Sequence, residues 1–580
     1  MKTAIFVLAI LFLSSFFLAM QTTMAQQQPP ITIHWVVSAG ATKDLEIAEI
    51  MKKELIQIGI DVKIESFDKA SFLARTYFNP GLTFDQGGSD AAYQGYSWML
   101  TDYIWYIGCY TSDYLPPIGW NYWAWRDGTA DTLIRNGMSS YNTTYRMQNL
   151  YAWQEEHQKD VGTIVVGYPL YAQMTRKEIK GYNGMLRAYD AGNWTVEGAT
   201  HPVTVRYISH FATGLVTGLL PFYLGSGYIE LNTMYRSLYQ VGRTPEGRYA
   251  AVPDMAESVE YSADGMMATF HLRHDIKWHD GVPFTSKDVK YTFDVLMDPK
   301  AEAEYYGDFS AAVSSVSAPD DYTVVLHLAK PTPELTTLLM SSYSLIVPEH
   351  VLGKIPHDQL KASDYNTKTP PPGTGPFKFK AWTRAEYMQL EASKDFYRGA
   401  PAIDSLVFEA ITEPMTGLAA LKKGDAQMLD IYFSVEFPDE IPGLKANPDL
   451  HVETVPYPRT LFIALNHNHP ALGNRLVRQA IAYLVPYDQI RDQVYKGMIQ
   501  LGNSPIVAST WGWDPNALQY HYDPAKAKEL MAMAGYAPWP PPAAEIPSSV
   551  YVVPAVEALV AGLIVGFGAT YAVLRRKKSE

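Results

Sequence analysis

The feature that most constrains the fold is a strand–helix–strand pattern near the start of the sequence. Apolar residues alternate along residues 31–37 and again along residues 60–64, as they do on strands with one buried face. Between them, residues 47–58 carry apolar side chains at helical spacing, and Gly59 follows as a residue suited to ending a helix. Two strands joined through a helix run parallel. We therefore expect an α/β fold with a parallel sheet.

Composition limits the class of protein that this chain of 580 residues can belong to. A hydrophobic fraction of 47% and a charged fraction of 18% are typical of a globular protein, and the length allows two or three domains. The net charge of -13 argues against a nucleic-acid partner, because phosphate binding needs a basic face. Cys109 is the single cysteine, which excludes an intrachain disulfide.

Both ends of the sequence carry segments typical of export across a membrane or insertion into it. Residues 1–25 have the pattern of a secretory signal peptide, with a charged start, an apolar stretch and a small-residue cleavage site. Residues 552–574 are long and apolar enough for a transmembrane helix, and the basic tail 575–580 predicts a cytoplasmic C-terminus. The Pro-rich residues 538–551 predict a stalk. We expect a single-pass protein of the cell membrane with its body on the extracellular side.

The sequence contains no motif that identifies an enzyme. It has no GxSxG nucleophile elbow, no GxxxxGK[ST] phosphate loop and no HExxH zinc motif. Histidines cluster within residues 271–279 and 467–469, but His pairs without Cys or carboxylate companions are usually structural, so we expect no metal and no other cofactor. Glycosylation sequons at Asn142 and Asn193 fit exposure outside the cell. A binding protein is favoured over an enzyme.

From residue 254 onward, the chain contains six long sequence segments that occur in the same order as in a known group of proteins. The phrases are DMAESVEYSADGMMATFHLRHDIKWHDGVPFTSKDVKYTFDVLMDP (254–299), APDDYTVVLHLAKPTPELTTLL (318–339), PGTGPFKFKAW (372–382), DFYRGAPAIDSLVF (395–408), LFIALNHNHPALGNRLVRQAIAYLVPYDQI (461–490) and YDPAKAKELMAMAGY (522–536). In this order they resemble the family-5 extracellular solute-binding proteins of oligopeptide/dipeptide-type ABC transporters. The first phrase predicts a hairpin that turns at Asp264 and Gly265, then a helix capped by Thr285 or Ser286.

The resemblance implies a two-lobed α/β fold, periplasmic-binding-protein-like of type II (the Venus-flytrap fold), with an extra small domain on lobe one. It also implies closure of a hinge on a ligand and delivery to the permease subunits of an ABC importer, with no bond broken by the binder. An oligopeptide is the implied ligand. An oligosaccharide bound on the same fold is one alternative, and a surface protein used in adhesion or sensing without transport is another.

The order of the segments departs from the family pattern. Residues 31–183 resemble the family's C-terminal third, which would ordinarily follow the phrase ending at Tyr536. The chain therefore looks circularly permuted, with residues 185–201 joining the old ends; a degenerate tandem is the competing interpretation, although each phrase occurs once. On this interpretation lobe one with its small domain is 166–456, and lobe two combines 26–165 with 457–537.

The candidate ligand site lies in the stretch GYSWMLTDYIWYIGCYTSDYLPPIGWNY (95–122). In peptide-binding members an Asp of lobe two pairs with the α-amino group of the ligand, and the resemblance gives that role to Asp102; capping of the following segment is its alternative role. The segment SAGATKD (38–44) lacks the Arg that receives the ligand carboxylate in dipeptide binders, which argues against a strict dipeptide site. The candidate ligand-binding residues are Asp102, Trp98, Tyr103, Trp105, Trp120 and Asn121. Trp123 and Trp125 extend the aromatic set, for which three roles are open: a surface for a sugar, the lining of an apolar peptide pocket, or simple packing.

Overall fold

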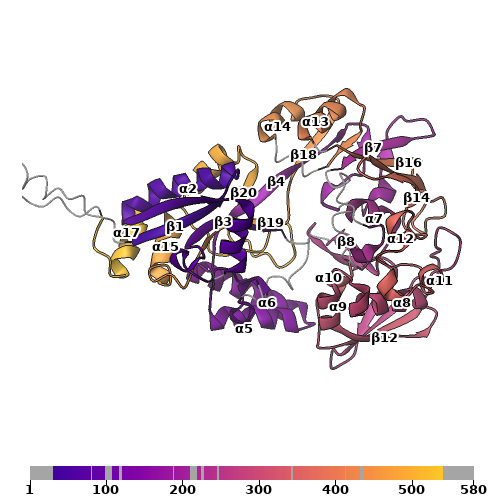
Figure 1. Cartoon of the computed structure of the whole chain (residues 1–580), viewed down its shortest axis with the longest axis horizontal. Coiled ribbons are helices and arrows are strands. Elements are labelled where there is room, and N and C mark those ends of the chain that lie inside the picture. The colour runs from indigo at the N-terminus through magenta and orange to yellow at the C-terminus, as the bar shows by residue number, and fades with distance from the viewer. Residues whose placement is uncertain are drawn as a thin grey trace, which may run out of the picture.

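The computed structural model shows a mixed α/β protein with two lobes (Figure 1). Among the described residues, no helix is both long and apolar enough to cross a bilayer. The predicted signal peptide, transmembrane helix and tail, and the stalk from residue 540 onward, lie outside the described residues. The structure describes residues 31–79, 81–97, 108–115, 120–186, 189–209, 218–223, 228–244, 247–340, 344–411, 413–430 and 437–539.

One large sheet runs through both lobes. Within the described residues it has 12 strands, ten of them in the order β14–β15–β16–β7–β17–β4–β19–β3–β1–β2, while β18 and β20 pair with β4. The strands are β1 (Ile31–Ser38), β2 (Ile60–Phe67), β3 (Ala91–Ser97), β4 (Ile164–Arg176), β7 (Thr204–Ser209), β14 (Phe377–Thr383), β15 (Tyr387–Ala392), β16 (Ser405–Ala410), β17 (Met428–Leu429), β18 (Leu450–Pro456), β19 (Arg459–Leu465) and β20 (Ile499–Leu501).

The strand–helix–strand unit predicted at the start of the chain is confirmed. β1 and β2 pair in parallel, from Ile31 opposite Ile60 onward. Helix α2 (Thr42–Leu55) connects them and buries the apolar stripe that its spacing predicted. A 3₁₀ turn follows α2, and Gly59 ends it with a φ of 80°, a left-handed conformation that glycine adopts without steric cost.

Strand β4 passes from one lobe into the other. Its first half pairs with β19 and β20, and its second half pairs with β17 and β18. Figure 1 shows β4 between the two lobes, with β1 and β3 on one side and β7 and β16 on the other. We call these parts the β1 lobe and the β7 lobe.

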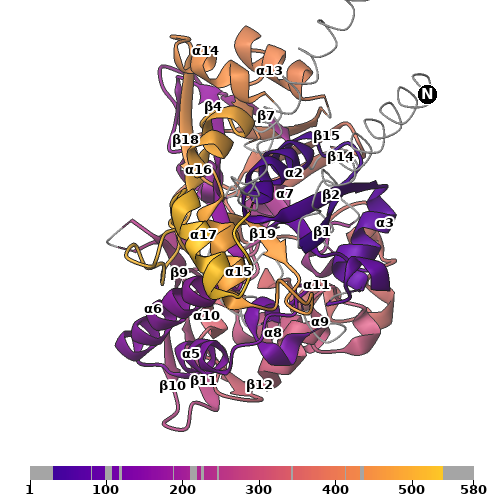
Figure 2. The ribbon, with the colours of Figure 1, turned by 90° about the vertical axis from the view of Figure 1, so that its left-hand side faces the viewer.

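The β1 lobe is built from two stretches that are far apart in the sequence. One core cluster contains residues of β1, β2 and α2 together with residues of β19, α15 (Arg475–Tyr483) and α17 (Pro524–Met533). Helices α15 and α17 pack side by side (Figure 2). On the opposite face of the sheet, α5 (Gly128–Ser139) and α6 (Thr143–Asp160) cover a second cluster whose buried aromatic residues include Tyr110, Trp123, Trp125 and Trp153.

The β7 lobe carries a small four-stranded sheet in the order β10–β11–β13–β12. The predicted hairpin is confirmed, because β10 and β11 pair antiparallel and Gly265 adopts a φ of 69° in the turn. Of the two predicted caps, Thr285 and Ser286, the N-cap is Thr285, which forms a capping box with Asp288 at the start of α8. The further elements of this lobe are α7 (Tyr228–Met234), β8 (Tyr239–Arg243), β9 (Tyr249–Pro253), β10 (Ala256–Tyr261), β11 (Met267–Leu272), α8 (Ser286–Leu296), α9 (Tyr306–Ala312), β12 (Val313–Asp320), β13 (Thr323–Leu328), α10 (Leu335–Leu339), α11 (Glu349–Leu352), α12 (Asp364–Thr367), α13 (Pro414–Lys423) and α14 (Ile441–Lys445).

Candidate functional site

The strand directions make the carboxyl ends of the two lobes' parallel strands face each other. β3 is parallel to β1 and antiparallel to β19, and β19 is antiparallel to β4, so β1 and β3 run in the same direction as β4, toward the β7 lobe. β17 is antiparallel to β4 and parallel to β7, so β7 runs back toward the β1 lobe. In open α/β sheets ligands bind beyond the carboxyl ends of the strands. The space between the lobes is therefore the candidate ligand site.

Several chain segments that follow these strand ends lie outside the described residues. They are residues 98–107 after β3, 210–217 after β7 and 431–436 after β17. Four of the predicted ligand residues, Trp98, Asp102, Tyr103 and Trp105, fall in the first of these segments.

Trp120 and Asn121 are described, and they differ sharply in exposure. The Trp120 side chain is 44% exposed, and its ring lies 6.1 Å from the ring of Tyr122. Asn121 is fully buried; its amide nitrogen donates to the carbonyls of Thr111 at 3.1 Å and Trp125 at 2.7 Å, and its side-chain oxygen accepts from the Trp125 amide at 3.1 Å. Asn121 thus holds the backbone of the loop that presents Trp120.

Trp123 and Trp125 pack in the protein interior, which is one of the alternatives that the sequence left open for the aromatic set. Both side chains are buried in the cluster beneath α5 and α6. The Trp125 indole donates to Asp160 at 2.7 Å, and both rings pack on Tyr110. These two tryptophans stabilise the β1 lobe and cannot stack on a ligand there.

A cluster that we had not predicted stands at the carboxyl edge of the β1 lobe. Arg459 begins β19, and its electrostatic neighbours include Tyr93 of β3, Tyr171 of β4 and Tyr495. The Tyr93 and Tyr495 hydroxyls are 2.9 Å apart and share a hydrogen bond. Asp44, in the first turn of α2, has its pKa raised by burial, although the nearby positive charge of Arg459 acts in the opposite direction. The cluster therefore places the positive charge of Arg459 and the carboxyl group of Asp44 near each other on the same edge of the lobe.

A buried acid stands at the facing edge of the β7 lobe. Glu230 in α7 is 1% exposed and accepts a hydrogen bond from the Ser209 hydroxyl, at the end of β7, at 3.0 Å. Burial raises the pKa of Glu230 to about 7. Its Oε2 atom is buried without a partner among the described residues. This edge therefore carries a carboxyl group that is withdrawn from solvent and bonded to the end of β7.

Away from β4, the lobes meet through buried polar contacts. Arg146 of α6 forms an ion pair with Glu334, which precedes α10, and its guanidinium also lies 4.7 Å from the Trp511 ring. The Tyr141 hydroxyl donates to the Gly265 carbonyl at 3.1 Å and accepts from the Thr332 amide at 3.2 Å. These contacts hold the lobes together in the conformation seen here.

Further contacts between the lobes involve residues 509–513. The Tyr249 amide donates to the Ser509 carbonyl at 3.2 Å. The Arg248 guanidinium donates to the Trp513 carbonyl at 3.2 Å and lies 5.7 Å from the Trp513 ring. A segment of the β1 lobe thus pairs directly with the start of β9 in the β7 lobe.

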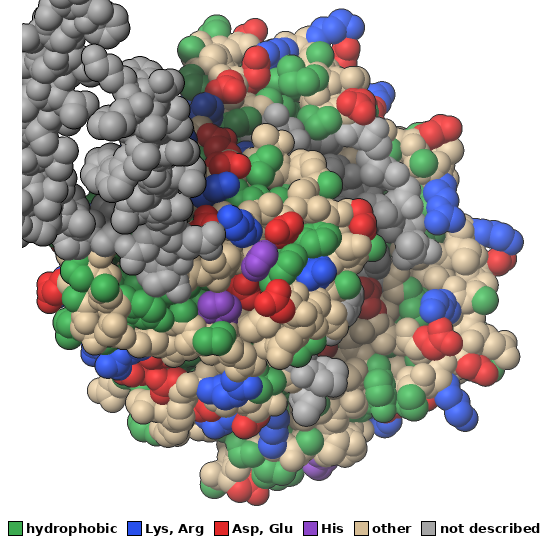
Figure 3. Space-filling view, turned by 60° about the vertical axis from the view of Figure 1, so that its left-hand side comes forward, with side chains coloured by type: hydrophobic (Ala, Val, Ile, Leu, Met, Phe, Trp, Pro, Cys, Tyr) green, Lys and Arg blue, Asp and Glu red, His purple; other side chains and the backbone are tan. Residues whose placement is uncertain are grey.

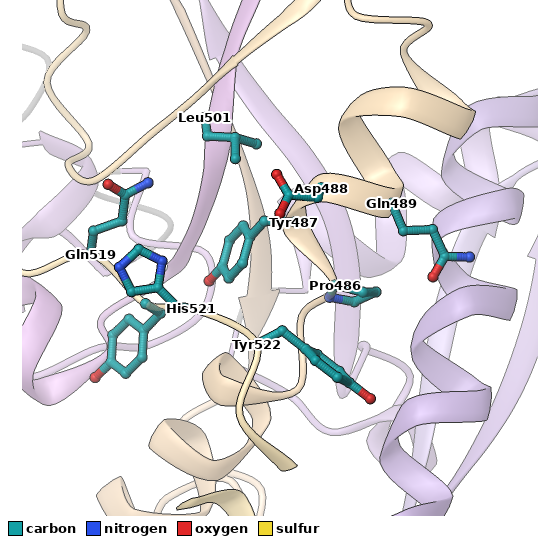
Figure 4. A pocket seen from close by; sticks show the side chains of 9 residues that line it. Pro486, Tyr487, Asp488, Gln489, Leu501, Gln519, His521 and Tyr522 are labelled. Carbon is teal, nitrogen blue, oxygen red and sulfur yellow. The ribbon is translucent and has the colours of Figure 1, made fainter.

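Two surface hollows of the β1 lobe lie elsewhere. One of about 490 Å³ is lined by residues 486–489, Leu501 and residues 519–522, from the end of β20 that points away from the β7 lobe (Figure 4). Another of about 600 Å³ lies beside His34 and Asp90, next to the amino end of β3. On the face in Figure 3, acidic and basic side chains are intermixed. Neither hollow lies at the facing carboxyl edges.

The predicted histidine clusters have structural surroundings. Burial lowers the pKa of His279 to about 4, and its Nε2 lies 2.9 Å from the Gly375 carbonyl. His467 is half-buried, and its Nε2 lies 3.2 Å from the Gly162 carbonyl. Among the described residues, no group of three or more His, Cys, Asp or Glu side chains is placed to hold a metal ion.

Two α/β lobes joined through a shared sheet, with facing carboxyl edges, define a two-lobed binding protein of the periplasmic type II class. The profile of the bacterial extracellular solute-binding proteins, family 5 Middle, matches residues 250–541, half of the chain. The chain belongs to this family, whose members bind solutes.

Individual relatives carry names from the same group. A putative ABC transporter peptide-binding protein of Brucella ovis is 34% identical over 286 residues, which cover 49% of this chain and 52% of that protein. The oligopeptide-binding protein AppA of Bacillus subtilis is 28% identical over 285 residues, covering 49% and 51%. The structure of HbpA2 from Haemophilus parasuis matches 58% of this chain and 67% of its own at 24% identity, with a TM-score of 0.48. The chain spans about half the length of the curated relatives it matches.

Proposed function

We propose that this protein is the substrate-binding component of an ABC importer, capturing oligopeptides between its lobes and delivering them to the permease. The carboxyl ends of the parallel strands in the two lobes, which face each other, are the observation that carries the proposal. The names of the relatives support peptides as the ligand class.

Within this proposal, Asp102 binds the α-amino group of the peptide. The peptide side chains are contacted by Trp98, Tyr103, Trp105 and Trp120. Asn121 contributes by holding the backbone of the loop that presents Trp120. Trp120 supports this assignment, since its side chain is partly exposed and its ring lies beside that of Tyr122. An Asp102→Ala variant should bind peptides with a free amino terminus more weakly, and peptides with an acetylated terminus equally well.

The ligand class is tested by thermal unfolding of the full chain in detergent against panels of peptides and of oligosaccharides. A ligand at 100 times its dissociation constant should stabilise the folded state by about 2.7 kcal/mol. A shift with peptides supports the proposal. A shift with sugars alone would replace peptides by oligosaccharides, and no shift with either would favour a surface protein without transport.

We also propose that the chain is a circular permutation of the family fold. The first stretch of the β1 lobe, residues 31–67, shares a core with residues 461–531, and α17 contacts the turn that ends α2. Tyr522 beside α17 also donates to Glu54 of α2. A rearranged gene that joins residue 537 to residue 31 and opens the chain within 185–201 should give the same fold. An insoluble or unfolded product would support the degenerate tandem instead.

The body is proposed to be held on the outer face of the cell membrane. A signal peptide at 1–25, a stalk at 538–551 and a helix at 552–574 would provide export and anchoring. Fractionation of cells expressing the full chain and a chain ending at residue 545 tests this. The full chain should stay with the membrane after alkaline washing, whereas the shortened chain should be released.

A further inference from the structure

The hollow of about 490 Å³ on the β1 lobe is lined by tyrosines and lies apart from the facing carboxyl edges. Its lining comes from residues 486–489 and 519–522, together with Leu501 of β20 (Figure 4). The side chains of Tyr487 and Tyr520 are 7% and 6% exposed, whereas that of Tyr522 is 44% exposed. The lining is therefore aromatic, and it includes one tyrosine ring that a bound segment can cover.

Two polar side chains add hydrogen-bond donors to this lining. Gln519 and His521 are both exposed, and neither forms a side-chain hydrogen bond with another described residue. The Tyr522 hydroxyl is already used, because it donates to Glu54 of α2. Aromatic rings beside such donors suit a Pro-rich segment, whose prolines offer carbonyl acceptors and flat apolar rings but no N–H group.

The chain itself supplies a segment of this kind close to the hollow. Residues 540–551, PPPAAEIPSSVY, contain four prolines and one charged residue, Glu545. Tyr522 lies two residues before α17, and the described chain continues for six residues after α17, to Trp539. α17 is about 15 Å long and six residues add at most about 20 Å, whereas twelve residues in polyproline conformation span about 37 Å. The segment is therefore long enough to return to the hollow.

We propose that residues 540–551 dock into this hollow. A proline ring packs on the exposed Tyr522 ring, and carbonyl groups of the segment accept hydrogen bonds from Gln519 and His521. Because the predicted membrane helix begins at residue 552, docking holds the outer end of the β1 lobe beside the membrane instead of letting the body turn freely on a stalk. The ligand between the lobes takes no part in this contact.

Pairs of introduced cysteines in the full chain, held in detergent, test the docking. Ala543→Cys is combined with Asp488→Cys in the hollow or, as the matched control, with Glu529→Cys on α17. Asp488 and Glu529 are both exposed acids that pair with a basic residue three positions away, and Glu529 is closer to the segment in the sequence. The native Cys109 is 1% exposed and so does not compete.

The rate of disulfide formation under mild oxidation is the readout. The hollow pair should react about 10-fold faster than the control pair or more, because docking raises the effective concentration of the two thiols above that of a free tether. Equal rates, or faster reaction of the control pair, overturn the inference. A disulfide between two chains, seen as a product of twice the mass, also overturns it and assigns the hollow to the segment of a second copy.

Variants of Tyr522 separate the contribution of its ring from that of its hydroxyl. Tyr522→Ala should slow the hollow pair to the control rate, and Pro540→Ser, Pro541→Ser and Pro542→Ser together should do the same. Tyr522→Phe loses only the bond to Glu54 and should keep most of the advantage. An unchanged rate in Tyr522→Ala contradicts the docking. None of these readouts depends on ligand binding, so the inference and the proposed function can fail independently.

Discussion

Removing Glu334 should weaken ligand binding by opening the lobes, without touching the ligand. The Glu334 side chain is 7% exposed and that of Arg146 is 11% exposed, so each charge is almost fully withdrawn from water when the lobes are together. A Glu334→Ala variant leaves Arg146 buried without its anion in the closed conformation only. In the open conformation water can solvate Arg146 again. The substitution therefore makes the free energy of lobe closure less favourable and leaves the open conformation unaffected.

The size of the effect follows from the contacts that remain. Losing one partner of a buried ion pair costs about 3–5 kcal/mol. Arg146 keeps its bond from Nε to the Gly137 carbonyl at 3.0 Å and its contact with the Trp511 ring, which reduces the cost. We expect about 2–3 kcal/mol, which lowers the closed population and the apparent affinity by roughly 30- to 150-fold.

Two measurements check this prediction together. Calorimetric titration with a peptide from the panel gives the affinity, and small-angle scattering of the ligand-free protein gives its compactness, which should decrease in Glu334→Ala. Arg146→Ala combined with Glu334→Ala should lose little more than either change alone. Asp364→Asn is the control, because Asp364 forms an exposed ion pair with Lys368 on the β7 lobe and should leave both readings unchanged. Wild-type affinity and scattering in Glu334→Ala would refute the closure role.

Three further predictions concern the stability of the fold. Asn121→Ala removes three buried hydrogen bonds and should lower the free energy of unfolding by about 2–4 kcal/mol in a denaturant titration; a loss below about 0.5 kcal/mol would contradict its role in the loop. Burial raises the pKa of Asp190 to about 7, so the folded state keeps a proton that the unfolded state loses near pH 4, and stability falls as pH rises between these values. The unfolding midpoint of Asp190→Asn should lack that part of the decline, and a curve parallel to wild type would refute it. Burial lowers the pKa of His157 to about 3, so stability should fall as pH drops below about 6.5; His157→Gln should flatten that acid limb, and an unchanged limb would argue against this residue as its source.

Local patterns predicted the local structure well. The alternation in residues 31–37 and 60–64 gave a parallel strand pair, and Gly59 and Gly265 marked turns that do adopt positive φ. Thr285 caps its helix as its position predicted. These features depend on side-chain periodicity and backbone conformation over a few residues, so the sequence carries them directly.

The candidate ligand site depends on contacts between residues that are far apart in the sequence. Trp120 and Trp125 lie five residues apart in one aromatic segment, yet one is exposed and the other is packed on Tyr110. Periodicity could not separate them, because their exposure is decided by α5 and α6, which follow in the chain. The cluster around Arg459 was missed for a related reason: an Arg before a strand is ordinary, and its neighbours Tyr93, Tyr171 and Asp44 come from β3, β4 and α2, which are far from it in the sequence.

The two polar features of the interlobe region should act separately, because they lie at different distances from the strand that joins the lobes. β4 changes partners from β20 to β18 between Pro169 and Leu170, and the Tyr171 ring stacks on Tyr457 at 4.2 Å beside this point. Arg459 is two residues from Tyr457, whereas the α6–α10 contact lies away from β4 in Figure 1. A side chain next to the crossing strand moves little when the lobes separate, so Arg459 should keep its surroundings in both conformations. A pair far from it is broken by the same motion, so Arg146 and Glu334 should set the affinity for every ligand alike. Glu334→Ala should therefore lower the affinity for every ligand of the panel by a similar factor, and a loss confined to one ligand would contradict a role in closure alone.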